Sequence, residues 1–389
     1  MIERVLIPLI LFILVPYLYI DYRYMRRLRW WKRLLWWVPA LVLIGFGVYL
    51  STLPDFLPPN PTPVFLYLLA LGLIVAPKFA WSLCSLCGHV YCRLFHKRRN
   101  YGNLVGLLAI VGVLYVVLYG SFVGVKQMQV NHMELAFEDL PDSFDGYRIV
   151  QFSDIHLGSM TGFRADMVRR AVDSINAQHP DAIVFTGDIQ NTSPSEIRPH
   201  LKTLARLKAK DGIFSVRGNH DYDYYIDGDM NRHADNMYET VGRQYELKWR
   251  PLLNAHHKIR RGKDRIVIAG LENDDEGRFP QLANLGNALN GLSRNDFVVM
   301  LEHDPSAWRR KILPHSHAQL TLSGHTHGGQ FRLFGWAPVS LHYQECCGLY
   351  TAGPRMLYVS AGLGGLLPFR FGIKGEIDVI VLRKAKTEK

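Results

Sequence analysis

The heptapeptide Gly324-His325-Thr326-His327-Gly328-Gly329-Gln330 is the strongest local indication of what this chain folds around. His325 and His327 are two positions apart, so in an extended segment both imidazoles leave the backbone on the same side. The flanking glycines allow the chain to turn tightly beside whatever the two rings hold. The arrangement suits metal ligation, but taken alone it is equally typical of two solvated loop histidines. The rest of the sequence has to decide between these interpretations.

Four apolar stretches make up the first third of the 389-residue chain. They span residues 5–20, 34–53, 64–86 and 104–123, each close to the ~20 residues that a helix needs to cross a bilayer. Three further spans follow the first stretch, and no small-residue cleavage pattern does, so we expect an anchor and not a signal peptide. Within the spans Lys78 is the single formal charge beyond the extreme N-terminus, which argues against a transport pathway. We therefore interpret residues 1–124 as a four-helix transmembrane anchor.

The loops between these stretches differ in charge. Residues 51–62 contain no Lys or Arg, whereas the other two loops are basic. Basic loops favour the cytoplasmic side, which predicts a multi-pass protein of the cytoplasmic (inner) membrane with everything after residue 124 on the outer, extracytoplasmic side. A nucleic-acid site in these loops is the weaker alternative, because the tryptophans beside them are typical of interfacial anchoring. The basic residues are Arg23, Arg26, Arg27, Arg29, Lys32 and Arg33 in one loop, and Arg93, Lys97, Arg98 and Arg99 in the other.

The net charge of +11 is concentrated in the membrane region. Residues 1–124 hold 12 Lys and Arg against 3 Asp and Glu, which leaves 33 against 31 for the rest of the chain. The second part is therefore nearly neutral, and we expect no nucleic acid among its partners.

The five cysteines form no complete motif. Cys84, Cys87 and Cys92 lie at the inner end of the third span, where a C-x2-C pair raises the alternatives of zinc or redox chemistry. No second C-x2-C completes a four-ligand site, so we interpret them as small apolar residues. For the adjacent Cys346 and Cys347, the sequence leaves open whether they stay reduced or pair between chains.

From residue 148 onward the chain alternates between short apolar runs and helical stretches such as 164–178 and 196–207, after a linker or edge strand at 125–147. This alternation predicts an α/β domain over residues 148–389, with its functional groups on the loops at strand ends. Five apolar runs each end in polar residues. These are Asp154 and His156, then Asp188, then Asn219, His220 and Asp221, then Glu302 and His303, and finally His325 and His327.

The five blocks D-x-H, G-D, G-N-H-D, a lone His and G-H-x-H stand in the order of the calcineurin-like metallophosphoesterases, which the chain resembles over about residues 148–382. The extended G-H-T-H-G-G-Q and the run 358–370 resemble the branch of bacterial membrane-associated phosphodiesterases. Asn191 stands where relatives often carry Asp. The resemblance implies a four-layer α-β-β-α sandwich with two metal ions between its strand ends.

The resemblance also implies a ligand set. Asp154, His156, Asp188 and His327 would hold the first ion, and Asp188, Asn219, His303 and His325 the second. The chemistry agrees independently, because a shared carboxylate brings two cations to ~3.5–4 Å, where they clamp a phosphoryl oxygen and lower the pKa of a bridging water. Carboxylate, amide and imidazole ligands without thiolate favour two divalent ions of manganese, iron, zinc or magnesium.

His220 lies outside the ligand set of relatives and is expected to contact the phosphate and protonate the leaving oxygen, with Asp221 orienting its ring. The alternative is an ordinary loop histidine. Tyr222–Arg250 is either a substrate-selecting cap or a surface excursion with one helix. Arg370 is expected to be a fold-stabilising surface residue and not a phosphate contact.

The functional hypothesis is a membrane-anchored phosphoesterase that hydrolyses phosphodiester or lipid-linked phosphate substrates by attack of a metal-bridging hydroxide. Its partners would be a phosphate ester and membrane lipid, since tethering raises the effective concentration of membrane substrates. One alternative is a pyrophosphate hydrolase of a nucleotide-linked lipid precursor of the UDP-diacylglucosamine type, which fits poorly with an outward-facing site. Another is a catalytically inactive binding module, which would be expected to have lost a ligand. The oligomeric state is not predicted.

Overall fold

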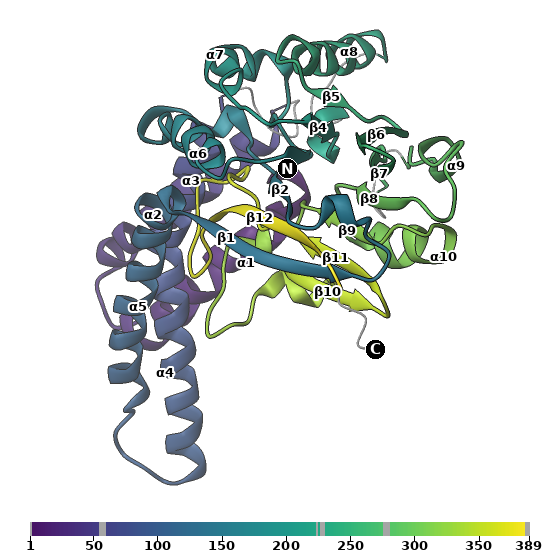
Figure 1. Ribbon diagram of the computed structural model, residues 1–389. Helices are drawn as coiled ribbons and strands as arrows, with labels where there is room; N and C mark the ends of the chain where they lie inside the picture. Colours follow the sequence, from purple (N-terminus) through teal and green to yellow (C-terminus); the bar gives the residue numbers. More distant parts are fainter. Residues whose placement is uncertain (1, 54–59, 223–224, 226–229, 275–280, 386–389) are drawn as a thin grey trace. The chain divides into compact units, whose positions relative to one another are not determined.

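The computed structural model of the protein describes residues 2–53, 60–222, 225, 230–274 and 281–385. The chain divides into two compact units, Met1–Val123 and Gly124–Lys389 (Figure 1). The first unit is helical, and the second is built on β-sheets.

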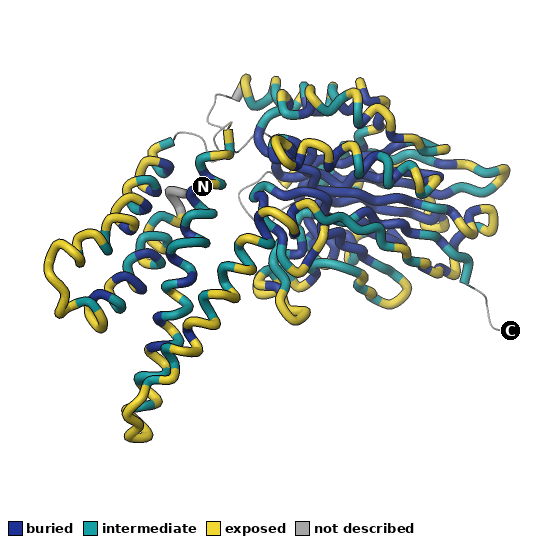
Figure 2. Tube along the Cα trace, turned by 90° about the vertical axis from the view of Figure 1, so that its left-hand side faces the viewer, coloured by how far each residue is buried: buried dark blue, intermediate teal, exposed yellow. Residues whose placement is uncertain are grey.

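The first unit consists of long apolar helices. Among the described residues, four helices are long and apolar enough to cross a membrane: Val5–Met25, Trp30–Ser51, Thr62–Leu94 and Gly102–Lys126. Many of their apolar residues are exposed (yellow in Figure 2), as expected where lipid is the solvent. The prediction of four spans is confirmed. The elements are α1 (Ile2–Ile20), α2 (Trp30–Ser51), α3 (Thr62–Ala70), α4 (Ala76–Leu94) and α5 (Gly102–Phe122).

The third span is longer than the predicted 64–86, and it is interrupted by a π-helical turn at Leu71–Val75. Pro77 follows this turn after one residue, Ala76. Because proline lacks an N–H and crowds the carbonyl of the preceding turn, a local widening relieves the clash. Lys78 uses the altered backbone, since its Nζ donates a hydrogen bond of 2.8 Å to the Ile74 carbonyl. The same Nζ lies 5.1 Å from the ring centre of Tyr17. The charge in the spans is therefore partnered inside the bundle.

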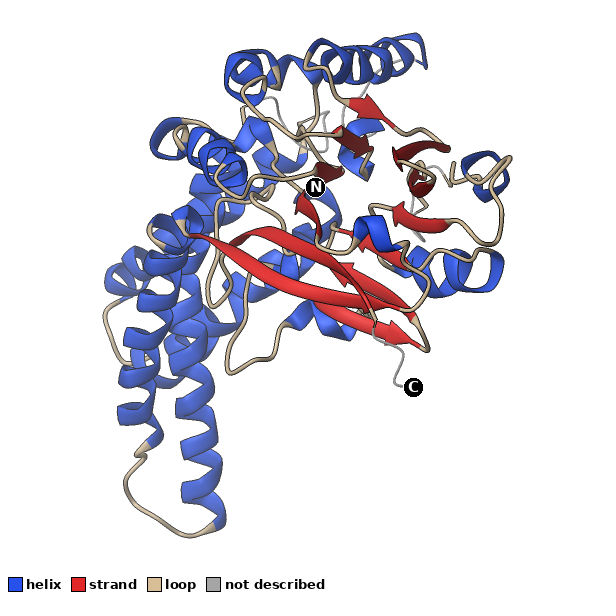
Figure 3. Cartoon of the chain, viewed as in Figure 1, coloured by secondary structure: helices blue, strands red, loops and turns tan. Residues whose placement is uncertain are grey.

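The second unit contains two six-stranded sheets in the part of the chain that the structure describes (Figure 3). The first has the order β1 (Met128–Phe137), β12 (Gly375–Lys384), β2 (Tyr147–Phe152), β3 (Ala182–Thr186), β4 (Gly212–Val216) and β5 (Arg250–Pro251). The second has the order β10 (Gly348–Ala352), β11 (Arg355–Val359), β9 (Leu320–Ser323), β8 (Phe297–Leu301), β7 (Asp264–Gly270) and β6 (Ala255–Arg261). β2, β3 and β4 are parallel neighbours, as are β7, β8 and β9.

Alternating strand residues build four layers. Ile149 and Val184 of the first sheet share one core with Leu301 and Leu322 of the second, so the sheets pack face to face. The opposite face of the first sheet is covered by α6 (Met167–Asn176) and α7 (Leu201–Leu204), and that of the second by α9 (Leu285–Ala288) and α10 (Leu313–His315). α8 (Met230–Glu246) precedes β5. The predicted α-β-β-α sandwich is confirmed.

One helix prediction is wrong in part. The stretch 164–178 contains α6, but 196–207 is not a continuous helix. It consists mainly of the 3-10 turn Arg198–His200 and the single turn of α7. Pro199 has no N–H to donate, which limits the regular helix to the residues that follow it.

Candidate metal centre and active site

The nine residues predicted for the site all lie on loops that directly follow strands. Parallel strands place their carboxyl ends at one edge of a sheet, and the two facing sheets bring both sets of loops together. Asp154 and His156 follow β2, Asp188 follows β3, Asn219, His220 and Asp221 follow β4, His303 follows β8, and His325 and His327 follow β9.

Three groups of possible metal ligands overlap among these residues. In each group the ligand atoms lie within 4.8 Å of one another. The groups are Asp154, His156 and His327; His156, Asp188 and His220; and Asp188, His303 and His325. Because His156 and Asp188 each belong to two groups, the residues form one continuous cluster.

Asp188 lies at the centre of this cluster. Its Oδ2 is 3.5 Å from His156 Nε2 and 3.3 Å from His303 Nε2. Its Oδ1 accepts a hydrogen bond of 2.9 Å from the backbone N–H of His220. The carboxylate thus faces an imidazole from each sheet, which is the position that a bridging ligand needs.

Asn219 joins the cluster through its side-chain oxygen. Oδ1 lies 3.1 Å from His303 Nε2 and 2.8 Å from His325 Nδ1. Its Nδ2 donates to the Tyr225 hydroxyl at 2.7 Å, which holds the amide with its oxygen toward the histidines. The structure thereby places this amide oxygen among the imidazoles of the second sheet.

The ligand loops have an unusual backbone. Asp154, His156, Asp188, His325 and His327 all have positive φ angles, of 51°, 50°, 61°, 71° and 52°. This conformation costs roughly 1–2 kcal/mol for a residue other than glycine. Strain of this kind concentrates at functional sites, where the surrounding fold enforces it. Here it turns each side chain inward within two to four residues of the strand end.

Glycines allow the loops to approach one another. A Cβ on Gly218 would collide with the Asp188 carboxylate, and a Cβ on Gly324 with the Ser153 hydroxyl and the Asp154 carboxylate. These contacts explain physically why glycine stands beside the ligand in the G-N-H-D and G-H-T-H segments.

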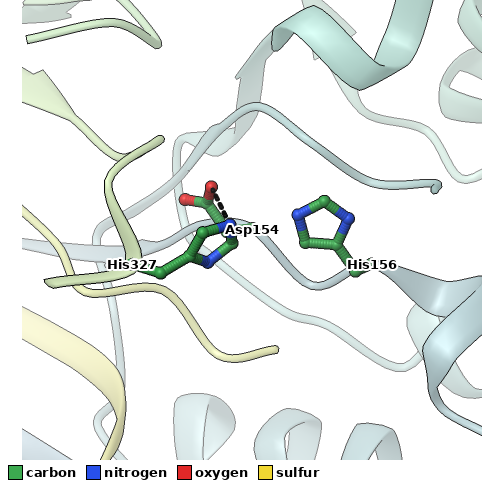
Figure 4. A group of neighbouring side chains, drawn as sticks. All are labelled: Asp154, His156 and His327. Atoms are coloured by element: carbon green, nitrogen blue, oxygen red, sulfur yellow. Dashed lines mark ion pairs between the residues drawn. The ribbon is translucent and has the colours of Figure 1, made fainter. Parts of the chain in front are cut away.

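The imidazoles around the first ligand group have buried nitrogens without hydrogen-bond partners. Figure 4 shows His156 and His327 beside Asp154, whose Oδ1 is 3.7 Å from His327 Nε2. Neither ring nitrogen of His156, nor Nδ1 of His327, has a partner. An unsatisfied buried polar group costs about 1–3 kcal/mol. Burial also lowers the pKa of both histidines to about 3, so the rings are neutral and can offer a lone pair. The residues therefore fit a bound divalent cation.

The second ligand group is electrostatically coupled. Burial opposes ionisation of Asp188, yet the neighbouring His303 and His220 imidazoles hold the pKa of Asp188 well below its ordinary value. Burial likewise disfavours the charged form of His303, but Asp188 raises the pKa of His303 well above the usual value. His303 Nδ1 pairs with the Thr186 carbonyl at 2.6 Å, which leaves Nε2 directed at Asp188. A cation bound at Nε2 requires the loss of its proton, so metal binding at this group depends on pH.

His220 is held by the backbone and by an aromatic ring. Its Nδ1 pairs with the Asn191 carbonyl at 2.6 Å, and its ring stacks on Tyr225 with centroids 4.1 Å apart. The ring also lies 4.8 Å from that of His156. With Nδ1 committed to Asn191, Nε2 is the nitrogen that remains for proton transfer.

The predicted contact between Asp221 and the His220 ring is wrong. The Asp221 carboxylate accepts hydrogen bonds from the backbone N–H groups of Gly218, Asp188 and Ile189, at 2.9–3.0 Å. Burial raises the pKa of Asp221 to about 7. Asp221 therefore joins the loops after β3 and β4, and the Asn191 carbonyl orients the imidazole instead.

Two tyrosines contact the site, although the sequence analysis did not assign them to it. Tyr225 binds Asn219 as described, and the hydroxyl of Tyr343 lies 2.7 Å from His325 Nε2. Tyr225 belongs to a tyrosine-rich run that closely follows G-N-H-D, and this proximity in sequence could have indicated that Tyr225 lies at the site. Tyr343 is 18 residues from His325 and has no such signal.

Other sequence predictions have mixed outcomes. The expectation of a surface position for Arg370 is wrong, because its side chain is buried and donates to the carbonyls of Ala361, Gly362 and Gly364. All five cysteines are free, although the Sγ atoms of Cys346 and Cys347 are 3.8 Å apart. The segment 222–250 contains α8, but residues 223–224 and 226–229 lie outside the described residues, so a substrate cap remains a prediction.

Comparisons with known proteins agree with this architecture. A family model described as "Calcineurin-like phosphoesterase" matches residues 147–329. A second, described as "Probable Calcineurin-like phosphoesterase, transmembrane domain", matches residues 3–125.

Three curated relatives are similar over most of the chain. "Transmembrane protein with metallophosphoesterase domain" of Danio rerio is 32% identical and covers 72% of this chain, which in turn spans 63% of that protein, less than two thirds of its length. "Uncharacterized metallophosphoesterase YkuE" of Bacillus subtilis is 33% identical, covering 63% of this chain and 82% of the relative. "UDP-2,3-diacylglucosamine pyrophosphatase LpxG" of Chlamydia muridarum is 26% identical, covering 72% of this chain and 97% of the relative.

The fold and the clustered carboxylates and imidazoles define an α/β domain with a candidate metal centre, preceded by helices that are long and apolar enough to cross a membrane. The chain belongs to the calcineurin-like metallophosphoesterase family.

Proposed function

We propose that this protein hydrolyses phosphodiester or lipid-linked phosphate substrates with two divalent ions held by the overlapping ligand groups. The observation that carries the proposal is Asp188, whose carboxylate faces imidazoles from both sheets. Bound ions would activate the attacking water and neutralise charge on the phosphoryl group. The proposed ligands are Asp154, His156, Asp188 and His327 for one ion, and Asp188, Asn219, His303 and His325 for the other.

The protein's own residues have distinct tasks in this proposal. Tyr225 holds the oxygen of Asn219 toward His303 and His325, where the second ion would bind, and the Asp221 carboxylate keeps the loop bearing Asp188 in place. His220 acts as the general acid: its Nδ1 is bound to the Asn191 carbonyl, so its Nε2 delivers the proton to the leaving oxygen.

A second candidate function is cleavage of a pyrophosphate bond in a nucleotide-linked lipid. The observation that favours it is the printed name of the Chlamydia muridarum relative, a UDP-2,3-diacylglucosamine pyrophosphatase. The two candidates differ in where the site must face, since nucleotide-linked substrates are mainly cytoplasmic.

We call the second unit, Gly124–Lys389, the catalytic unit. We propose that it faces the outer side of the cytoplasmic membrane, because the loops between the spans are basic. Reporters active only outside the cytoplasm test this directly. A fusion after Val123 should be active and a fusion after Arg33 inactive. The reverse pattern would place the catalytic unit in the cytoplasm and favour the nucleotide-linked substrate.

The function itself is tested by metal reconstitution of the full chain. The stripped protein, with single divalent metals added back, is assayed on a phosphomonoester, a phosphodiester and a pyrophosphate-linked substrate. We expect turnover of the phosphodiester only after metal is restored. Preferred cleavage of the pyrophosphate would support the second candidate, and metal-independent turnover would contradict both.

A further inference from the structure

The segment that directly follows the histidine motif exposes apolar side chains to an unusual degree. Leu333, Phe334, Trp336 and Leu341 are 41%, 100%, 51% and 80% exposed. We call residues 333–341 the apolar loop; they include no charged residue. A contiguous exposed apolar segment in a folded domain commonly marks an interaction site.

The tip of the apolar loop is a tight turn with an unfavourable residue. Leu333 and Trp336 exchange both backbone hydrogen bonds, at 2.9 and 3.0 Å, and the two residues between them have φ angles of 50° at Phe334 and 84° at Gly335. Turns with two positive φ angles normally carry Asn, Asp or Gly, because a bulky side chain is strained there. Phe334 is therefore fully exposed at a strained backbone position, and its side chain does not contribute to the packing of the domain.

The base of the apolar loop is connected through the segment 371–375 to the residues at which the chain enters the second unit. Phe331 pairs with Phe371, and the Arg332 N–H donates to the Phe371 carbonyl at 2.8 Å. Four residues later, the N–H of Gly375 donates to the Gln127 carbonyl at 3.0 Å. Four residues span at most ~14 Å, and Gln127 follows the end of α5 by only five residues. A bilayer is consequently within reach of the apolar loop through the chain's own tether.

The other end of the segment contacts the candidate metal centre. The hydroxyl of Tyr343 lies 2.7 Å from His325 Nε2, and the Thr326 hydroxyl donates to the Cys346 carbonyl. Both contacts reach the His-x-His segment, so the chain returns to the candidate metal centre within two to five residues of the end of the apolar loop.

We propose that the apolar loop inserts into the interface of the membrane that the chain spans, and so brings the metal centre to phosphate groups of membrane lipids. Trp336 suits the headgroup region, and Phe334 and Leu341 suit the adjoining acyl chains. The absence of Asp and Glu avoids repulsion by anionic lipids. The delivery of lipid phosphates rests on the proposed function, whereas insertion does not depend on it.

Insertion is tested without any substrate, on the full chain reconstituted into vesicles. The fluorescence of the Trp336→Phe variant is subtracted from that of the wild type, which isolates Trp336 from the other tryptophans. We expect the difference to be quenched by brominated acyl chains and protected from aqueous iodide. A matched control is Trp249→Phe, since Trp249 is only 1% exposed and its difference signal should respond to neither quencher. Quenching of Trp336 by iodide alone would overturn the proposal.

The consequence for activity is tested by the double variant Phe334→Asp/Leu341→Asp. Two rates are measured for each protein, one on a phosphodiester lipid in vesicles and one on a soluble nitrophenyl phosphodiester. We expect the ratio of the first rate to the second to be about tenfold lower in the double variant than in the wild type, because interfacial binding scales with buried apolar area. Leu349→Asp is the control, since Leu349 is 47% exposed on β10, outside the apolar loop, and its variant should keep the wild-type ratio. An unaltered ratio in the double variant would contradict delivery of the lipid by the apolar loop.

Two further outcomes separate this proposal from its neighbours. Wild-type protein that is quenched by brominated lipid but hydrolyses neither substrate contradicts the proposed function and supports insertion. Concentration-dependent dimerisation that Phe334→Asp abolishes, together with loss of the lipid quenching signal, would assign the apolar loop to a second copy of the chain and overturn insertion.

Discussion

The two sheets of the catalytic unit contribute different chemistry to one site. The first sheet supplies every carboxylate and amide oxygen of the proposed ligand set, on Asp154, Asp188 and Asn219. The second sheet supplies only imidazoles, on His303, His325 and His327. The first sheet also supplies the imidazole of His156, so it holds both the oxygen and the nitrogen ligands that a divalent ion such as manganese, iron or zinc accepts, whereas the second sheet adds nitrogen ligands alone.

The two contributions also differ in how tightly the fold holds them. The side chains of Asp154 and Asp188 are 0% and 2% exposed, whereas those of His325 and His327 are 14% and 17% exposed. The two carboxylates are therefore set in the protein core, whereas these two histidines reach partly to its surface. The comparison teaches that, in the proposed site, the first sheet would anchor the ions through buried carboxylates, while two of the three histidines of the second sheet stay partly exposed.

The largest effect on metal content and turnover is expected from substitution of Asp188, which follows a strand of the first sheet. Asp188→Asn keeps the shape but removes the charge that allows two cations to lie close together. Metal content and turnover should fall together by several orders of magnitude, measured by elemental analysis and by phosphodiester hydrolysis. Asp173→Asn, a change of an exposed carboxylate on α6, should leave both at the wild-type level. Full metal occupancy and activity in Asp188→Asn would refute the bridging role.

The second effect separates proton transfer from metal holding within the first sheet. His220→Ala should retain both ions yet slow hydrolysis by ~10²–10⁴-fold, the usual contribution of a general acid. A nitrophenyl ester has an acidic leaving group and should recover part of the rate, whereas an alkyl ester should not. Loss of metal from the variant would instead identify His220 as a ligand. Equal deficits for both esters would identify it as a phosphate contact without a proton to donate.

The third prediction compares the two sheets directly through their tyrosines. Tyr225→Phe removes the hydroxyl that orients Asn219, and Tyr343→Phe removes the one beside His325. Loss of an outer partner of a ligand typically costs 10–100-fold in metal affinity. Because the amide can turn its nitrogen toward the ion, we expect the larger loss of affinity in Tyr225→Phe, measured by metal titration. A larger loss in Tyr343→Phe would reverse the assignment of the first sheet as the anchoring side.

The smallest effect concerns the polar contact that joins the sheets. Asp378 on β12 accepts hydrogen bonds from Tyr358 at the other sheet, at 2.8 Å, and from Asn131 on β1, also at 2.8 Å. Burial raises the pKa of Asp378 from 3.8 to about 7. The native state therefore keeps a proton that the unfolded state loses, and this contribution to the free energy of unfolding disappears as the pH rises from about 4 to about 7.

Asp378→Asn is permanently neutral and should lack this pH dependence. Thermal unfolding of the full chain in detergent, followed between pH 4 and 7.5, measures the difference. We expect the wild type to lose stability relative to the variant across this range. Parallel curves for the two proteins would show that the carboxyl stays ionised in the folded state.

Properties that depend on local sequence could be predicted. Membrane spans require only a sufficient length of apolar residues, so the four spans follow from composition. Strand ends are marked by a change from apolar runs to polar residues, and this located Asp154, Asp188 and His303 at the edges where the structure has them. The length of the third span was underestimated, because polar residues after Leu86 continue a helix that starts in an apolar stretch.

Only the tertiary structure decided which groups touch. Asp221 follows His220 directly, yet neighbouring side chains leave the backbone in different directions, and its partners lie 32 and 33 residues away on the loop after β3. Tyr343 reaches His325, and Arg370 reaches three carbonyls, through packing that no local pattern records. The sequence by itself determined the kinds of ligand and their order along the chain. Their distances, partners and protonation were decided by the meeting of two sheets, because burial and electrostatic coupling exist only once distant segments are packed together.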